Sequence, residues 1–221
     1  MVDIFDEVSE DLRNERAVAL AKRYGGLLLI AMLAVLAGVG WQQFHAWYQR
    51  QQDNKAASAY LALVKPLDDA DGNVAPAQAL VAARALTNFA AGAPEGYRTL
   101  ADLRAAALYA GAGQTMQAEG LWDSVADDGD ADPLLRGLAN LLWAQHAMGN
   151  APDADVLARL RPLTTDTNAY HGLAREMQAL IYMHEGKNDL AKALLAQVAA
   201  DPASPDGLRN RAEGLLAKLN G

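Results

Sequence analysis

The feature that most constrains this chain is a long stretch without a charged residue. Residues 24–48 contain no Lys, Arg, Asp or Glu, and residues 27–41 are apolar throughout. Crossing the roughly 30 Å hydrocarbon layer of a membrane takes about 20 apolar residues. We therefore predict a transmembrane helix over residues 24–44. Aromatic residues lie near both ends of this segment, where membrane interfaces favour them: Tyr24, Trp41, Phe44, Trp47 and Tyr48.

Two other interpretations of this stretch are weaker. An export signal that is later removed typically has a short, basic leader, whereas the 23 residues before this stretch contain six acids. The best cleavage candidate, Gly38-Val39-Gly40, is followed by the bulky Trp41. A helix of this length buried inside a small soluble domain would be unusual. An uncleaved anchor is the preferred interpretation.

Cations near the two ends of the predicted span set its orientation. Cytoplasmic segments carry the excess of Lys and Arg. We therefore expect residues 1–23 in the cytoplasm, the span in the inner membrane, and residues 45–221 in the periplasm of a Gram-negative-type cell. Four cations precede the span and two follow it closely: Arg13, Arg16, Lys22, Arg23, and then Arg50 and Lys55.

Two features of the membrane region suggest contacts with other proteins. Residues 3–22 are expected to form a short helix that is either a solvated or interfacial lead-in to the span, or a docking handle for a partner. Within the span, Ala34 and Gly38 form a small-xxx-small pair, which can bring transmembrane helices close together. We name Ala34 and Gly38 as a candidate membrane helix contact, while membrane lipid surrounds the rest of residues 24–44.

Composition excludes several classes of function. The net charge of −8 and the pI of about 4.9 argue against nucleic acid as a partner, since nucleic-acid binders carry basic patches. The chain contains no Cys, which rules out disulfides, thiol catalysis and Cys-ligated metals.

The region after the span is predicted to be all-α. Apolar residues recur at intervals of three and four, and Gly-, Pro- and Asp-rich turns divide the chain into helices of roughly 12–18 residues. We expect helices near 51–67, 76–91, 95–111, 114–126, 133–148, 152–163, 168–185, 187–200 and 205–219.

An internal repeat is visible at an offset of 73 residues. Residues 97–122 align without gaps on residues 170–195, and the segment between them contributes a third unit, because Gly149 lies 36 residues after Gly113 and 37 before Gly186. A unit of about 36 residues is close to the roughly 34 of a tetratricopeptide repeat. The fold class is therefore an all-α, tetratricopeptide-repeat-like, right-handed helical-hairpin solenoid behind a single N-terminal transmembrane helix. The units lie near 97–132, 133–168 and 169–203.

The repeated positions carry the residue types that hairpin packing needs. Small residues let two helices approach closely, tyrosines fill the space between neighbouring hairpins, and a glycine permits the positive φ that ends the first helix. A large apolar residue packs inward one turn after the second small residue. Ten residues are assigned to this repeat packing: Ala106, Tyr109, Gly113, Ala118, Trp122, Ala179, Tyr182, Gly186, Ala191 and Leu195.

The helix near 205–219 has one apolar stripe, which predicts that it caps the last repeat, as solenoids require for solubility. Stacked hairpins form a concave surface of the kind that binds peptides or protein segments. The stripe comprises Leu208, Ala212, Leu215 and Leu219.

Motifs for catalysis, metals or cofactors are not evident. His184-Glu185 lacks the second His of a zinc-protease motif, and His146 and His171 are interpreted as core-edge or surface residues. The acidic run 127–132 resembles the start of a calcium loop, but Pro133 and Ala139 stand where such a loop needs Gly and Glu. We interpret it as a solvated turn, and expect no enzyme activity, no metal and no cofactor.

The whole arrangement resembles the ancillary subunit family of the SecYEG translocon, whose members are inner-membrane proteins with a periplasmic tetratricopeptide-repeat-like domain. The closest local similarities are "YRTLADLRAAALYAGAG", "ADPLLRGLANLLWAQ" and "ADPASPDGLRNRAEGLLAKL". The resemblance implies two partners, a SecYEG-like translocon and periplasmic chaperones, and a role in handing exported chains to the chaperones. It carries no catalytic residues. The alternative that the sequence leaves open is a scaffold for envelope assembly that recruits outer-membrane or cell-wall biogenesis factors.

Overall fold

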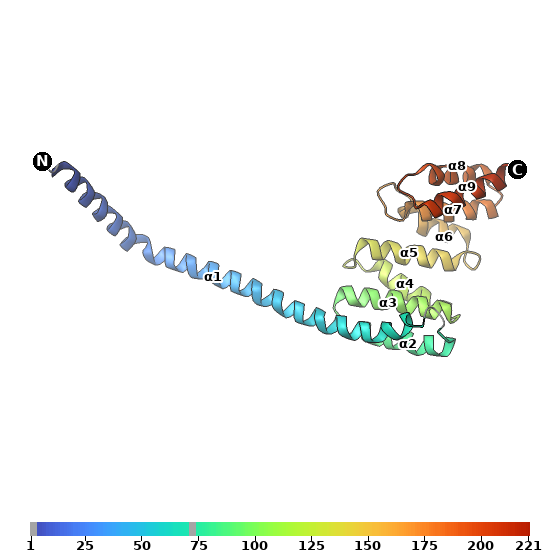
Figure 1. Ribbon diagram of the computed structural model, residues 1–221, viewed down its shortest axis with the longest axis horizontal. Coiled ribbons are helices and arrows are strands. Elements are labelled where there is room, and N and C mark those ends of the chain that lie inside the picture. The colour runs from blue at the N-terminus through green and yellow to red at the C-terminus, as the bar shows by residue number, and fades with distance from the viewer. Residues whose placement is uncertain (1–3, 71–73) are drawn as a thin grey trace. The chain divides into compact units, whose positions relative to one another are not determined.

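The computed structural model describes residues 4–70 and 74–221, with side chains described for residues 30, 32–70 and 74–221 (Figure 1). Within these residues the chain forms α-helices and one short 3-10 helix and contains no strand, so the all-α prediction is confirmed. The elements are α1 (Ile4–Asp68), α2 (Pro76–Ala90), α3 (Glu95–Gly111), α4 (Thr115–Asp127), α5 (Pro133–Ala147), α6 (Asp153–Leu160), η1 (Arg161–Leu163), α7 (His171–His184), α8 (Asn188–Ala200) and α9 (Asp206–Asn220).

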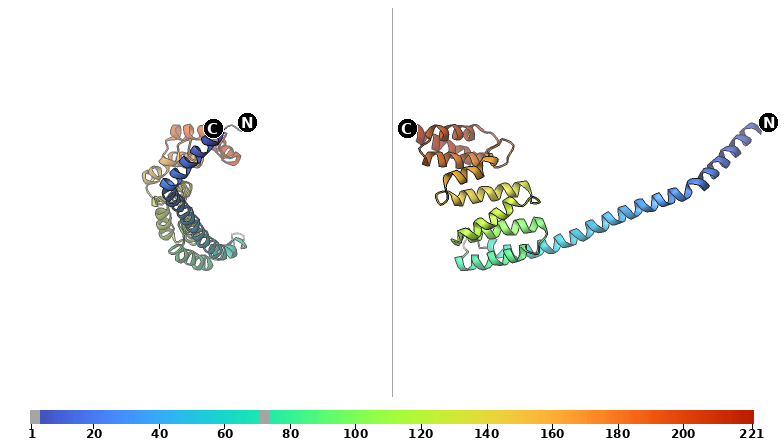
Figure 2. Two further views of the ribbon diagram at one scale, coloured as in Figure 1. Left: turned by 90° about the vertical axis from the view of Figure 1, so that its left-hand side faces the viewer. Right: turned by 180° about the vertical axis from the view of Figure 1, so that it is seen from behind.

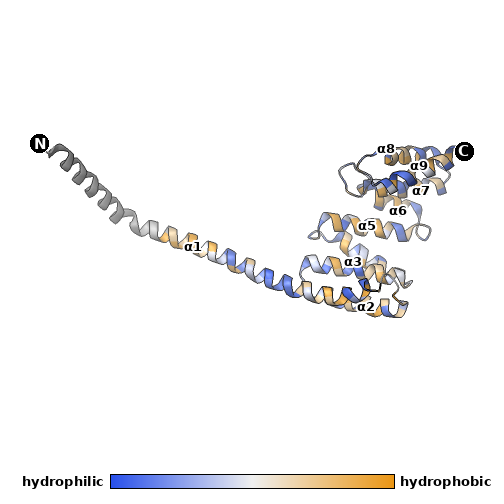
Figure 3. Ribbon diagram, in the orientation of Figure 1, coloured by the Kyte–Doolittle hydropathy of each residue, from blue (hydrophilic) through white to orange (hydrophobic). Residues whose placement is uncertain are grey.

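The chain divides into two compact units, Met1–Asn54 and Lys55–Gly221. Helix α1 contributes to both. The described residues of the first unit all lie in α1, and its large apolar side chains that are described are exposed: Ile30 and Val35 are each 65% exposed and Val39 is 53% exposed. In Figure 3 the first coloured turns of α1 are white to orange, toward the hydrophobic end of the scale, and the turns that follow are mainly blue. These side chains therefore belong to no core in this unit.

The prediction of a transmembrane helix over residues 24–44 lies partly outside the described residues. Segment 1–23 and residues 24–29 and 31 have no described side chains. Among the residues that are described, no helix has a stretch long and apolar enough to meet the requirement for crossing a membrane.

Proline and aspartate fix where several helices of the second unit begin. Pro76 and Pro133 occupy the first position of α2 and α5, where the missing proline N–H has no helical partner to lose. Asp132 caps α5, because its carboxylate accepts a hydrogen bond from the backbone N–H of Leu134 at 2.7 Å. Helices α3, α6 and α9 each follow a proline directly. These residues divide the array into short helices.

Three glycines make the turns inside the hairpins. Gly113, Gly149 and Gly186 have φ values of 76°, 80° and 74°. This left-handed region is unfavourable for residues with a Cβ atom. After Gly113, the backbone N–H of Gln114 donates back to the carbonyl of Tyr109 at 2.8 Å. The equivalent bond after Gly186 runs from Lys187 to Tyr182, also at 2.8 Å.

The core of the second unit is a series of four clusters that follow the order of the helices. Figure 2 shows the helices stacked one after another in sequence order. Leu86 belongs to the first cluster, Trp122 to the second, Leu160 to the third and Leu195 to the fourth, and all are almost fully buried. Each hairpin therefore packs chiefly on its neighbours, as expected of a repeat array.

Two predicted helix boundaries near the third cluster are wrong. The helix expected over 152–163 changes to a 3-10 turn after Leu160, because Pro162 has no N–H to donate to an α-helical hydrogen bond. The helix expected to begin at residue 168 begins at His171. There the Asn168 side chain accepts a hydrogen bond from the N–H of Tyr170 at 2.9 Å and holds a turn instead.

Candidate interaction surface

The residues assigned to repeat packing lie inside the array or at its turns. They hold the helices together and do not themselves provide a binding surface. Six of them are 0–1% exposed: Ala106, Ala118, Trp122, Ala179, Ala191 and Leu195. Tyr109 is half-buried and contacts the first and second core clusters. Tyr182 is half-buried against the fourth cluster, and the Lys187 ammonium lies 5.8 Å from its ring centroid.

The two small residues named as a membrane helix contact are in the first unit. Ala34 and Gly38 are both exposed. A Cβ built on Gly38 meets no atom within 4 Å. This position can therefore accept the close approach of another helix.

A surface cavity, called the groove below, lies at the first hairpin of the array. It is about 620 Å³ in volume and is lined by the end of α1, the loop after it and α2. Its lining is apolar except for Gln78, and Val81 at its edge is 67% exposed. Apolar pockets with a few polar groups are the usual sites for ligands. The lining includes Ala62, Leu63, Pro66, Val74, Gln78 and Val81.

A second cavity of about 470 Å³ lies next to the first and shares Leu67 and Val74 with it. It carries a charged pair, because Arg104 on α3 donates to the Asp68 carboxylate at 2.5 Å. The Arg104 Nε is buried and donates to no group among the residues that the structure describes. Burial raises the pKa of nearby Tyr60, with the Arg104 charge opposing and Asp68 adding to the rise. This end of the array thus combines an apolar groove with a neighbouring cavity that carries the Arg104–Asp68 pair.

Aromatic and charged side chains of α4, α5 and α6 stack at the edge of the core, from buried Trp122 to exposed His146. The Trp122 ring stacks on His146 at 4.8 Å between centroids. The Arg159 guanidinium lies 4.5 Å from the Trp143 ring centroid and also pairs with Asp123. Burial lowers the pKa of Arg159. Stacked arginine and aromatic groups of this kind stabilise packing, which assigns this cluster to the structure of the array.

Comparison with known families identifies the architecture. The family model of the tetratricopeptide repeat-like domain matches residues 20–218. The chain belongs to this family. Comparison with curated proteins and with solved structures finds no match. Domains of this family are typically interaction modules, which agrees with a site made of grooves rather than of catalytic groups.

The acidic run of this tetratricopeptide repeat-like domain makes local turns. The Asp128 carboxylate accepts from the N–H of Asp130 at 3.0 Å, and Asp132 caps α5. Among the described residues, no group of three or more His, Asp or Glu side chains is arranged to hold a metal ion. These carboxylates therefore position the start of a repeat.

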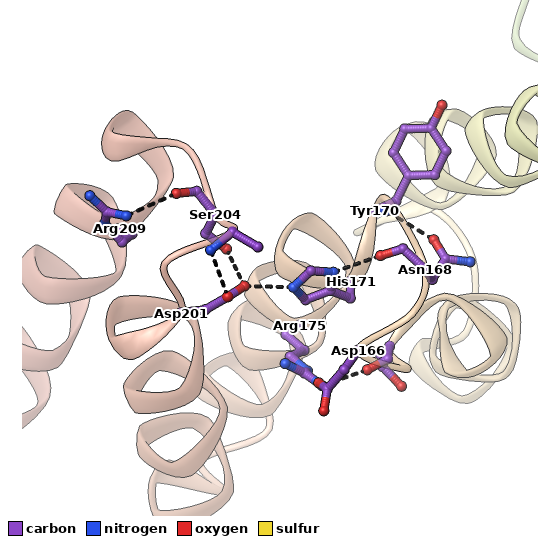
Figure 4. Close-up of polar contacts among 10 residues, drawn as sticks. Asp166, Asn168, Tyr170, His171, Arg175, Asp201, Ser204 and Arg209 are labelled. Carbon is purple, nitrogen blue, oxygen red and sulfur yellow. Dashed lines mark hydrogen bonds and ion pairs between the residues drawn. The ribbon is translucent and has the colours of Figure 1, made fainter.

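Sequence reasoning missed a polar network at the C-terminal end of the domain (Figure 4). His171 at the start of α7 contacts Asp201 in the turn between α8 and α9, with Nε2 2.5 Å from the carboxylate. The two residues are 30 positions apart in the chain. The side chains of Arg211 on α9 and Glu176 on α7 form two hydrogen bonds of 2.9 and 2.8 Å. The Asp-Pro-x-Ser sequence at 201–204 is the one local signal of this turn.

Sequence reasoning also missed the groove at the first hairpin. The Ala and Leu residues that line it are of the same types as those in the core. Only the structure separates buried Ala79 and Ala83 from exposed Ala77 and Val81 on the same helix.

Proposed function

We propose that this chain is a membrane-anchored protein-interaction module that works beside a Sec-type translocon and links protein export to periplasmic chaperones. Its family supports the interaction role. The family match begins at residue 20 and so includes the apolar stretch 24–44 together with the repeats. The sequence resemblance to translocon ancillary subunits supports the more specific role.

One observation carries the proposed anchor. In the described part of the first unit, apolar side chains of α1 are exposed at consecutive positions, including Val35 at 65% and Leu36 at 57%. Exposure at 35 and 36 places apolar groups on different sides of the helix, since successive residues are about 100° apart. A helix that is apolar all round is stable when lipid or protein surrounds it. Trp41 and Phe44 then occupy the interfacial end.

The groove at the first hairpin supports the proposed binding. Its lining is apolar except for Gln78 and lies on the end of α1, the loop after it and α2. We infer that it takes an apolar segment of a protein, either from a chaperone or from an emerging chain. Helix-in-groove recognition uses apolar side chains of this kind.

Photocrosslinking from the helix tests the role at the translocon. A photoreactive amino acid at Val35 or Leu36 in the full-length chain, in living cells, is expected to capture translocon subunits. The same amino acid at Met116 on α4, which is 81% exposed in the second unit, is the matched control and should not capture them.

The other outcomes of this experiment each decide something. Capture of outer-membrane or cell-wall assembly proteins would favour the envelope scaffold. Capture of lipid without protein would contradict the role at the translocon while keeping the anchor. Complete extraction of the intact chain from membranes by alkaline carbonate would contradict the anchor itself.

A further inference from the structure

The His171 ring lies between two hydrogen-bond acceptors. Its Nδ1 is 2.6 Å from the backbone carbonyl oxygen of Asn168, and its Nε2 is 2.5 Å from the Asp201 carboxylate. A neutral imidazole has a single N–H and can donate to only one of them. Both contacts are therefore hydrogen bonds only when the ring carries two protons and a positive charge.

The Asp201 carboxylate is held in place from its own side. It accepts hydrogen bonds from the Ser204 hydroxyl and from the backbone N–H of Ala203, both at 2.9 Å. The side chains of His171 and Asp201 are only 11% and 16% exposed. Water is therefore a poor substitute for either partner, so the contact depends on the charge of the ring.

The backbone of α7 next to His171 lies close against side chains of Ser204 and Leu208. A Cβ at Gly172 would lie 2.5 Å from the Ser204 hydroxyl oxygen and 2.9 Å from Leu208. The start of α7 therefore fits against the turn between α8 and α9 without spare room. A change at His171 acts directly on how α9 is docked.

The other charged groups around His171 are already paired. On α7, Arg175 lies one turn further on and donates to Asp166 and to the Thr164 carbonyl. On α9, Arg209 pairs with Asp206 and donates to the Ser204 carbonyl at 3.2 Å. Glu176 on α7 is paired with Arg211 on α9. Asp201 is thus the charge that responds to the proton on His171, and Arg175 opposes that proton.

We propose that protonated His171 is a pH-sensitive clasp that holds the α8–α9 turn on the start of α7, and that loss of its proton at alkaline pH loosens α8 and α9. This device goes beyond the proposed binding role, because it acts on the chain's own last repeat and cap.

The pH range of the clasp follows from the two partners. The Asn168 carbonyl and the Asp201 carboxylate raise the pKa of His171 above its ordinary value, against the effects of burial and Arg175. The contribution to stability is therefore complete below the unfolded pKa of about 6.5 and is lost as the pH rises through the higher folded value. Hydrogen bonds from His171, from the Ala203 N–H and from the Ser204 hydroxyl together lower the pKa of Asp201 to about 2. On the acid side, the contribution is lost as the pH falls from about 3.9 through that value.

Two measurements on the full-length chain in detergent micelles test the clasp. The first is a pH titration of the imidazole nitrogens by NMR, in which His171 should stay doubly protonated above the ordinary histidine pKa of about 6.5. The second is amide hydrogen exchange, corrected for its intrinsic pH dependence. Protection of α8 and α9 relative to α3 and α4 should fall on going from pH 6 to pH 9. The fall should be about tenfold for every pH unit between the folded and unfolded pKa values of His171.

Matched variants separate the clasp from general effects of pH. His171→Gln should make the relative protection of α8 and α9 independent of pH, whereas His184→Gln should leave the wild-type change in place. A His171 that titrates at or below about 6.5 overturns the proposal, as does an equal fall in protection in His171→Gln. The NMR titration decides the matter on the wild-type chain even if His171→Gln fails to fold.

Discussion

The two ends of the helical repeat array, Lys55–Gly221, are covered in different ways. At the N-terminal end, the last part of α1 and α2 leave an apolar cavity of about 620 Å³ with Val81 67% exposed beside it. At the C-terminal end, α9 covers the last core cluster with Leu208 and Ala212, which are 4% and 0% exposed. Charged contacts then tie α9 and its preceding turn to α7.

This difference separates an end of the array that has apolar surface free to bind a partner from an end whose apolar surface is covered by a helix. A repeat at the end of a solenoid has an uncovered face, which a capping element protects from water. Helix α9 provides that cap at one end. The first hairpin keeps apolar surface exposed, which is the property that a binding groove needs.

The largest expected effect comes from weakening the core in the middle of the array, between its two ends. Trp122→Ala should lower the free energy of unfolding by about 3–5 kcal/mol, because it removes a fully buried aromatic side chain from the middle of the core. Because neighbouring repeats are coupled mainly through their interfaces, the two ends should then unfold in separate steps. Urea unfolding followed by hydrogen exchange of α2 and α8 measures both effects.

The control for this experiment is Met116→Ala at an 81% exposed position, which should change stability by less than about 0.5 kcal/mol. A single, unchanged unfolding transition in Trp122→Ala would show that the ends are not coupled through this residue.

The tight fit at the C-terminal end predicts a smaller effect. Gly172→Ala should destabilise the chain by about 1–3 kcal/mol, because the new methyl group would overlap Ser204 and Leu208. Gly207→Ala on α9 is the matched control. A Cβ there meets nothing within 4 Å, so alanine should stabilise the helix slightly. Thermal unfolding of the two variants compares them, and equal melting temperatures would argue against the close packing of α7 on this turn.

The charged contacts should differ in strength between the ends. Glu176 is 7% exposed and accepts two hydrogen bonds from Arg211. Arg211→Ala should therefore cost about 1–3 kcal/mol, since it leaves a buried carboxylate without its partner. Arg211→Lys should recover only part of this loss, because lysine keeps the positive charge but cannot form two parallel hydrogen bonds to the carboxylate. Urea unfolding measures the three chains, and a neutral Arg211→Ala would show that water replaces the contact.

The smallest expected effect is at the N-terminal end. The side chains of Arg104 and Asp68 are 39% and 60% exposed, and exposed pairs contribute about 0.2–1 kcal/mol. Asp68→Asn should therefore change the urea midpoint less than Arg211→Ala does. A larger effect of Asp68→Asn than of Arg211→Ala would contradict the view that charged contacts stabilise the C-terminal end more than the N-terminal end.

Most helices of the second unit could be predicted because their ends have local causes. Pro76 and Pro133 begin helices, and Gly113 and Gly186 end them by taking a positive φ. The 73-residue offset then predicts that equivalent residues such as Ala106 and Ala179 have equivalent places, and both are 0% exposed. The residues that set these helix ends lie within a few positions of the ends themselves, so the sequence alone reveals them.

The remaining features depend on contacts between distant residues. The pairing of His171 with Asp201 is set by how α7 meets the next turn, and Arg211 meets Glu176 across 35 residues. The groove has the same cause, since Ala79 and Ala77 differ in burial but not in residue type. Sequence periodicity cannot separate such positions without knowing which helix covers them.

The most direct test of the account compares the two ends as binding surfaces. A photoreactive amino acid is placed at Val81 in the groove or at Leu190 on α8, in the full-length chain in living cells. The two sites are similarly exposed, at 67% and 51%. We predict protein adducts from Val81 and none from Leu190. Equal adducts from both sites, or adducts from Leu190 alone, would contradict the claim that the first hairpin is the binding end.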